Sequence, residues 1–228
     1  NLVPKNKILQ TNIWSSELAK LTANAFLAQR ISSINSIGAL CEATGADVRE
    51  VARAIGSDSR IGSKFLDSGP GFGGSCFKKD ILNLVYLSEY FGLPEVSQYW
   101  MGVVNINKWQ RKRIFELIVR KLFGTITSKK IGILGFAFKA NTNDTRDSSA
   151  IQICEELLNE GSNLIIYDPK VTKAQIEKDL SFKYEYLDEL DHFEENSLKV
   201  VNNINDVFNS TDCVIVMTEW NDFSNIDW

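Results

Sequence analysis

Histidine is the scarcest chemically active side chain in this sequence. The 228 residues contain one histidine, His192, which lies in an acidic stretch where we expect a solvated loop residue. Mechanisms that need a histidine base therefore lose almost all support. There are only four cysteines, far apart and without a C-x-x-C pair: Cys41, Cys76, Cys154 and Cys213. This spacing indicates neither a zinc site nor a disulfide framework, and we expect no bound metal.

Long apolar runs and an excess of basic residues are missing as well. No apolar run approaches the roughly 20 residues that a helix needs to cross a bilayer, so we expect no membrane span. The formal net charge is −4 and no basic patch with interleaved aromatic residues is present, so we expect no nucleic-acid partner. The chain starts at Asn1 without an initiator methionine or a signal-peptide pattern. We therefore expect a cytoplasmic protein and a chain that is part of a longer one.

The first part of the sequence has a helical pattern. Hydrophobic residues make up 44% of the sequence, which is enough for a core, and the length predicts two compact units. In residues 1–127, apolar residues recur at three- and four-residue steps, which predicts an all-α domain. A long helix is expected over residues 14–43, with Ser15 or Ser16 as its cap and Gly45 at its end. Further helices are expected at residues 47–55, 77–87 and 95–123.

The second unit, residues 128–228, changes to the pattern strand, helix, strand, helix, strand. Strands that are apolar on both faces and joined by helices form a parallel sheet, so we predict a Rossmann-like α/β domain and an α/β fold class overall. A nucleotide would bind at the carboxyl ends of the strands, near Lys139 and Asp168. Because the G-x-G-x-x-G fingerprint is absent, a generic α/β domain explains the pattern nearly as well. The expected strands are residues 129–139, 163–169 and 213–218, and the expected helices are 150–160 and 205–209.

A glycine-rich loop at residues 69–80 is the most distinctive stretch of the sequence. Four of the 14 glycines fall within six residues, and Cys76 follows them at or just before a predicted helix start. Helix N-termini favour anions, and Lys78 and Lys79 add positive charge, so we expect the thiol to have a lowered pKa and to suit a nucleophile. The alternative is a glycine-rich loop with an incidental small cysteine.

Two further groups of polar residues are candidates for a site. Lys20 and Asn24 lie four residues apart, so they share one face of the predicted long helix in an otherwise small and apolar run. A solvated helix face explains them about as well as a functional role does. Arg60 and Lys64 lie in a polar segment with glycines, where they would contact an anionic ligand or only water.

Three segments in colinear order resemble the UDP-glucose/GDP-mannose dehydrogenase family, and its eukaryotic members most closely. They are residues 12–35, residues 71–80, and residues 134–139 with 144–146. The loop Gly73-Gly74-Ser75-Cys76 and the Lys-x-x-x-Asn helix are specific to this family. The resemblance implies a central helical dimerisation domain and most of a C-terminal UDP-sugar-binding domain. The family's NAD-binding domain would lie upstream of Asn1.

The resemblance also implies a reaction, the NAD-dependent oxidation of UDP-glucose to UDP-glucuronate through a thiohemiacetal and a thioester on Cys76. Lys20 and Asn24 would stabilise the oxyanion, with Lys20 also placed for proton transfer, and Asp80 would orient the base or a water. Arg60 would reach the substrate of an adjoining subunit. The implied substrate-binding residues are Lys20, Asn24, Arg60, Lys64, Phe65, Leu66, Phe72, Gly73, Phe138 and Lys139. The implied NAD-binding residues are Cys76, Phe77, Lys78, Lys79 and Arg146.

Three alternatives compete with this hypothesis. A related family member would oxidise GDP-mannose or a UDP-N-acetylhexosamine instead of UDP-glucose. This chain alone would only dimerise and bind a UDP-sugar, since it lacks the cofactor domain. A thiol acyl hydrolase built on Cys76 has little support because no histidine base accompanies the thiol.

Overall fold

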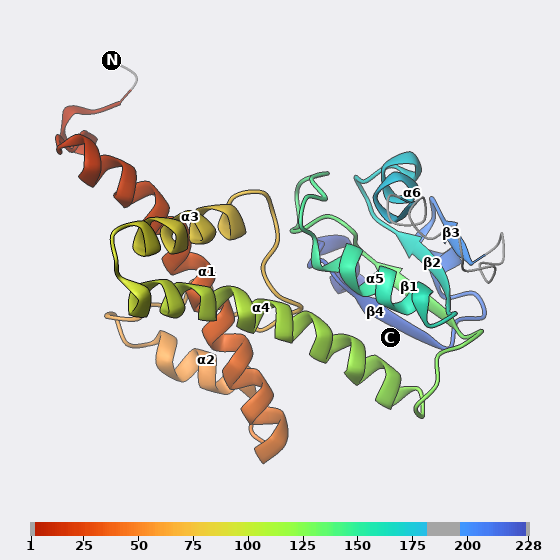
Figure 1. The fold of residues 1–228 in the computed structure, drawn as a ribbon. Coiled ribbons are helices and arrows are strands. Elements are labelled where there is room, and N and C mark those ends of the chain that lie inside the picture. The colour runs from red at the N-terminus through yellow and green to blue at the C-terminus, as the bar shows by residue number, and fades with distance from the viewer. Residues whose placement is uncertain (1–2, 182–196, 227–228) are drawn as a thin grey trace.

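The computed structural model describes residues 3–181 and 197–226, so His192 lies outside the described residues. A helical part and an α/β part follow one another along the chain (Figure 1). The predicted fold class is therefore confirmed. The domain boundary at residues 127 and 128 stays a prediction. In the described part of the chain, no helix combines the length and apolar character needed to cross a membrane.

Four helices form the first part: α1 (Ile13–Thr44), α2 (Val48–Gly56), α3 (Phe77–Tyr90) and α4 (Pro94–Lys121). The expected cap of α1 is wrong, because Asn12, rather than Ser15 or Ser16, accepts a hydrogen bond from the Ser15 amide at 2.8 Å. Gly45 ends α1 as predicted, with the left-handed φ of 80° that glycine adopts without strain. A 3-10 turn, η1 (Lys5–Lys7), precedes the bundle.

The helical core lies where α1, α3 and α4 cross. Ala25 and Ala28 of α1 are fully buried there, and their small side chains let the helix backbones approach closely. Ile81 of α3 and Val104 of α4 complete the contact. This packing places the start of α3, which follows Cys76, beside Lys20 and Asn24 in the first half of α1.

The second part is a parallel sheet with the order β3-β2-β1-β4. Its strands are β1 (Lys130–Leu134), β2 (Asn163–Tyr167), β3 (Leu198–Val200) and β4 (Cys213–Val216), and its helices are α5 (Ser149–Asn159) and α6 (Lys173–Ser181). The three predicted strands are present. The prediction missed α6 and the edge strand β3, and the helix expected at residues 205–209 is a 3-10 turn, η3 (Ile204–Val207). Another 3-10 turn, η4 (Asn221–Asn225), follows β4.

Helix α4 joins the two parts. Its first half packs in the helical core through Val103 and Val104, whereas Ile118, near its end, belongs to the core of the sheet. The second half of α4 runs alongside α5 (Figure 1). One continuous helix therefore sets the position of the α/β part relative to the start of α3.

Candidate active site

Cys76 lies at the N-cap of α3, where the sequence predicted it. Its side chain is exposed and makes no capping hydrogen bond, so the sulfur is free for other contacts. The Ser75 hydroxyl lies 3.8 Å from the sulfur. The sulfur therefore lies at the positive end of the α3 dipole, beside the first amides of the helix.

Lys20, Asn24 and Asp80 meet one turn after Cys76. The Asp80 amide donates to the Cys76 carbonyl at 2.9 Å, the spacing of a single helical turn. One oxygen of Asp80, Oδ2, accepts from Lys20 Nζ at 2.5 Å and from Asn24 Nδ2 at 2.6 Å. Asp80 is 2% exposed, whereas the Lys20 side chain is 59% exposed. A buried carboxylate on α3 thus fixes two polar side chains of α1.

The charges of this cluster support one another. Burial has the largest effect on the pKa of Asp80 and raises it, but hydrogen bonds from Lys20 and Asn24 and the charges of Lys20 and Lys79 outweigh burial, so the pKa is lowered overall. The hydrogen bond to Asp80 raises the pKa of Lys20, and the charges of Asp80 and the Cys76 thiolate add to this. At neutral pH the cluster therefore holds an ammonium ion beside a carboxylate, and Cys76 lies within the electrostatic range of that ammonium.

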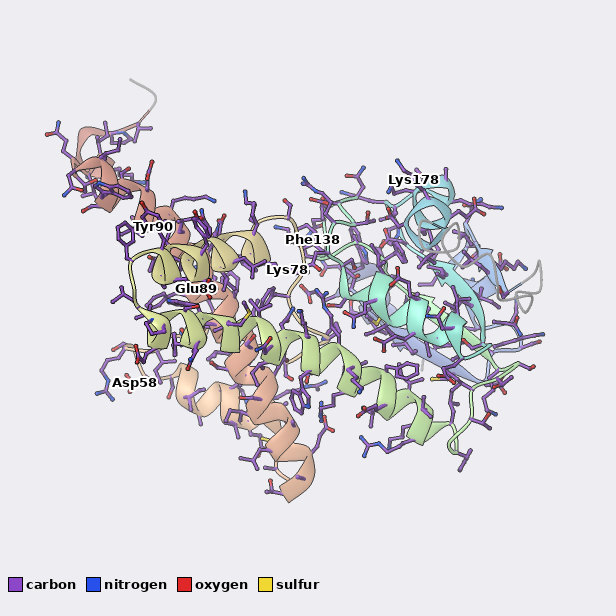
Figure 2. The ribbon with its side chains drawn as sticks, in the orientation of Figure 1. Asp58, Lys78, Glu89, Tyr90, Phe138 and Lys178 are labelled. Atoms are coloured by element: carbon purple, nitrogen blue, oxygen red, sulfur yellow. The ribbon has the colours of Figure 1, made fainter. Side chains whose placement is uncertain are left out.

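The glycines of the loop allow a close approach to the α/β part. A Cβ on Gly73 would lie 2.5 Å from the Asp147 carbonyl oxygen, and a Cβ on Gly74 would lie 2.9 Å from the Phe138 ring. The Gly74 amide donates to the Arg146 carbonyl at 2.8 Å. The structure therefore brings the Cys76 loop against Phe138, one of the expected substrate residues. Figure 2 shows Lys78 and Phe138 at this junction of α3 with the α/β part.

The expected NAD-binding cations lie around the same junction. Lys78 Nζ is 3.8 Å from Asp147 Oδ1, and Lys79 Nζ is 3.8 Å from the second oxygen of Asp80. Arg146 is exposed and pairs with Asp144, which raises the pKa of Arg146, with a smaller effect from the Cys76 thiolate. Of these cations, Arg146 lies within electrostatic range of the exposed thiol, and Lys79 lies against the buried carboxylate one turn after it.

The segment that carries Arg60 is held differently. Arg60 forms an exposed ion pair with Asp58 at 2.6 Å instead of reaching the Cys76 cluster of its own chain. Arg30 of α1 donates to three carbonyl oxygens of this segment, those of Ile61, Gly62 and Lys64. Phe65 has a positive φ of 61°, and Leu66 is buried. The segment therefore has a fixed shape that presents Arg60 to the outside.

Beyond the carboxyl end of β1, Lys139 is exposed and its Nζ lies 5.4 Å from the centre of the Phe138 ring. Asp168, the other residue expected near a nucleotide, is buried and its carboxylate is used by the protein itself. It accepts hydrogen bonds from the amides of Phe136 and Ala137 and from Trp220 Nε1. Asp168 therefore shapes the turn before Phe138 rather than offering an open ligand. Among the described residues, no cluster of histidine, cysteine or carboxylate side chains could hold a metal ion.

Three buried polar residues of α4, which were not predicted as part of the site, contact the loop. Gln110 Nε2 donates to the Gly69 carbonyl at 2.8 Å, Asn107 bonds both polar groups of the Phe72 backbone, and Arg111 reaches the Phe72 carbonyl. Their spacing of three and four residues puts them on one helix face. Polar residues at this spacing interrupt a helix face whose other buried residues are largely apolar. The sequence shows the spacing, so it could have indicated a polar contact made by α4.

Comparison with known proteins gives two matches to one family. The central domain of the UDP-glucose/GDP-mannose dehydrogenase family matches residues 14–109, and the UDP binding domain of that family matches residues 132–228. The UDP-glucose 6-dehydrogenase of Caenorhabditis elegans is 53% identical, over 100% of this chain and 46% of its own length. That of Gallus gallus is 56% identical, over 99% and 45%. The chain thus spans about half the length of these relatives.

Solved structures agree in fold. A UDP-glucose dehydrogenase from the hyperthermophilic archaeon Pyrobaculum islandicum is 31% identical, with a TM-score of 0.79 over 94% of this chain and 45% of that one. A UDP-D-ManNAc dehydrogenase from Pyrococcus horikoshii is 23% identical, with a TM-score of 0.74, and supports the fold alone.

Proposed function

Because the chain belongs to the UDP-glucose/GDP-mannose dehydrogenase family, we propose that, within its full-length protein, it takes part in the NAD-dependent oxidation of UDP-glucose to UDP-glucuronate. The observation that carries this proposal is the hydrogen-bonded group of Lys20, Asn24 and Asp80 one helical turn from the exposed Cys76 thiol. It combines a nucleophile with groups that stabilise negative charge on oxygen.

Cys76 is the proposed covalent nucleophile. Its sulfur attacks the C6 carbon at the aldehyde level, which forms a C–S bond and leaves the former carbonyl oxygen as an oxyanion. After oxidation to the thioester, water adds to the same carbon and the C–S bond breaks, so that a carboxylate and the free thiol are released. The chemistry that NAD⁺ supplies when bound is hydride acceptance, twice for each sugar, which removes four electrons in total.

Lys20 and Asn24 stabilise the oxyanion in this proposal. The Nζ of Lys20 and the Nδ2 of Asn24 are donors whose positions the buried carboxylate of Asp80 fixes in advance, and fixed donors are more effective than mobile ones. The raised pKa of Lys20 keeps its side chain an ammonium ion. Lys20 is therefore better suited to donate a hydrogen bond or a proton than to remove a proton, and Asp80 orients it.

The ligand-binding residues expected from the resemblance form part of the same proposal. Phe72, Gly73, Phe138 and Lys139 line the junction between the loop and the sheet, where a UDP-sugar would bring C6 to Cys76. For NAD⁺, the exposed cations Lys79 and Arg146 near the thiol fit the charge of a dinucleotide. Arg60, which is exposed on its own chain, would act on the active site of an adjoining subunit.

A second copy of the chain is the proposed partner. Large apolar side chains remain exposed on the central helices, among them Phe26 and Leu40 of α1 and Trp109 of α4. Exposed apolar residues of this size support a homo-oligomer formed through these helices. A cytoplasmic location belongs to the same proposal.

Steady-state assays of the full-length protein test this function. We expect two NADH to form for each UDP-glucose consumed, and much lower kcat/KM for GDP-mannose and UDP-N-acetylhexosamines. A preference for another nucleotide sugar, or one NADH for each sugar, would contradict the proposal. The chain of residues 1–228 alone serves as a control and should form no NADH.

A further inference from the structure

Arg111 connects the Cys76 loop to the α/β part through its whole guanidinium group. Nη2 donates to the Phe72 carbonyl at 2.7 Å and to the Asp147 carbonyl at 2.8 Å. Nη1 donates to Asp147 Oδ1 at 3.0 Å, and Nε donates to Ser149 Oγ at 3.0 Å. Its side chain is 6% exposed. Only a planar group with several donors can make these contacts at once.

Asn107, one turn earlier on α4, fixes the same loop residue from the same helix face. Its Oδ1 accepts from the Phe72 amide at 2.8 Å, and its Nδ2 donates to the Phe72 carbonyl at 3.0 Å. Both polar backbone groups of Phe72 are therefore bound by α4. Gly71 lies against the side-chain amide of Asn107, since a Cβ on Gly71 would lie 2.6 Å from Asn107 Oδ1.

The loop needs this external support because of its own sequence. Gly73 and Gly74 separate Phe72 from Ser75 and Cys76, and glycines restrict a backbone less than any other residue. The position of Cys76 relative to the α/β part thus depends on hydrogen bonds made to the loop. Phe72, bound by Arg111, is the last well-anchored residue before the two glycines.

Asp147, which Arg111 also binds, has a costly backbone conformation. Asp147 has a φ of 52°, in the left-handed region that residues other than glycine seldom adopt. It is also the residue whose carbonyl lies against Gly73. Arg111 bonds both the carbonyl and the carboxylate of Asp147, so it stabilises this turn and the neighbouring loop together.

We propose that Arg111 is a positioning residue that holds the Cys76 loop in register with the Phe138–Lys139 turn, so that the thiol meets C6 of a sugar bound to that turn. This inference rests on the proposed function and extends it to a residue whose side chain is buried. Arg111 acts through the backbone of Phe72 and through Asp147.

Arg111→Lys in the full-length protein is the main test. Lysine keeps the charge but cannot bond the Phe72 and Asp147 carbonyls, the Asp147 carboxylate and Ser149 together. A misplacement of about 1 Å can cost about 10²-fold in rate, so we expect kcat to fall by about that factor, while the KM for UDP-glucose and the Kd for UDP change less than about threefold. Arg120→Lys is the matched control, because Arg120 lies on the same helix and its side chain is exposed. It should keep its activity.

Two further measurements separate positioning from a loss of folded protein. Added guanidinium should restore part of the kcat of Arg111→Ala, which a merely unfolded variant would not show. The rate at which iodoacetamide alkylates Cys76 should differ severalfold between Arg111→Ala and the wild type, and this readout needs no turnover. If Arg111→Ala does not fold, Asp147→Asn replaces it as the test. Asparagine tolerates the same backbone conformation, and this variant should also lower kcat.

The outcomes distinguish the two proposals. A wild-type enzyme without UDP-glucose oxidation would contradict the proposed function. The alkylation rate of Cys76 in Arg111→Ala, compared with the wild type, would then test the positioning role of Arg111. An active wild type with an equally active Arg111→Lys variant, or unchanged alkylation of Cys76 in Arg111→Ala, would overturn the positioning role.

Discussion

Lys20 Nζ lies 2.5 Å from Asp80 Oδ2, although 60 residues separate the two in the sequence. The bond joins the exposed end of a side chain on α1 to a buried carboxylate on α3. Asp80 lies one helical turn after Cys76, the N-cap residue of α3. The same residue therefore sets the position of the Lys20 ammonium group and lies one turn from the thiol. This relationship explains why a carboxylate is buried there at the cost of its hydration.

Asp80→Asn should therefore impair the reaction more than substrate binding. The amide keeps the size of the side chain but removes the charge that orients Lys20. We expect kcat in the full-length protein to fall by about 10²-fold, because a donor that is no longer fixed stabilises the oxyanion poorly. Comparison of kcat with KM for UDP-glucose checks this. A variant with wild-type kcat would show that Asp80 does not orient the site.

The same substitution should change how stability depends on pH. The pKa of Asp80 is lowered in the folded state, so its contribution is fully present above the unfolded value of about 3.9 and is lost as pH falls through the folded pKa. Urea unfolding between pH 3 and 7 should therefore show a shallower acid decline for Asp80→Asn than for the wild type. An unchanged slope in Asp80→Asn would contradict the linkage.

The four thiols should differ in reactivity under native conditions. Cys76 is exposed, Cys41 and Cys154 are buried, and Cys213 is half-buried. Burial raises the pKa of Cys154 strongly and that of Cys213 as well, so both remain protonated at neutral pH. We expect iodoacetamide at pH 7.5 to modify Cys76 first, measured by peptide mass spectrometry. Cys76→Ala should remove the fast phase, and rapid labelling of Cys154 would contradict the described packing.

Cys76→Ala should also abolish the conversion of UDP-glucose to UDP-glucuronate in the full-length protein. Without the sulfur, no covalent bond can hold the aldehyde-level carbon, so the second oxidation loses its thioester route. Product analysis by chromatography, together with the yield of NADH, measures this. Complete two-step oxidation by the alanine variant would show that catalysis does not pass through the thiol.

The sequence predicted the elements whose evidence is local. Regular apolar spacing predicted the long helices, and four-residue spacing placed Lys20 and Asn24 on one face. It did not predict β3, because three residues at a sheet edge, with Lys199 exposed, are too few to show a pattern. The contact of Arg111 with Phe72 and Asp147 joins residues that are 39 and 36 positions apart, and only the packing of α4 brings them together.

The approach of the loop to the sheet gives the sharpest test of the site's geometry. Gly74 has a φ of 85°, and a Cβ there would meet the Phe138 ring at 2.9 Å. Gly69 lies in the same loop, has no positive φ, and has no atom within 4 Å of an added Cβ. Gly74→Ala should therefore lower the free energy of unfolding by about 1–3 kcal/mol, from backbone strain and the clash together. Gly69→Ala should be neutral or slightly stabilising, because it only restricts the unfolded chain.

Urea unfolding of both variants measures this difference, and activity in the full-length protein adds a second readout. If the loop must lie against Phe138 for Cys76 to reach the sugar, Gly74→Ala should lose kcat even at temperatures where it is fully folded, whereas Gly69→Ala should not. Equal stability and activity of the two variants would mean that the loop moves away from Phe138 in solution. The Cys76 position proposed here would then be wrong, because it requires that contact.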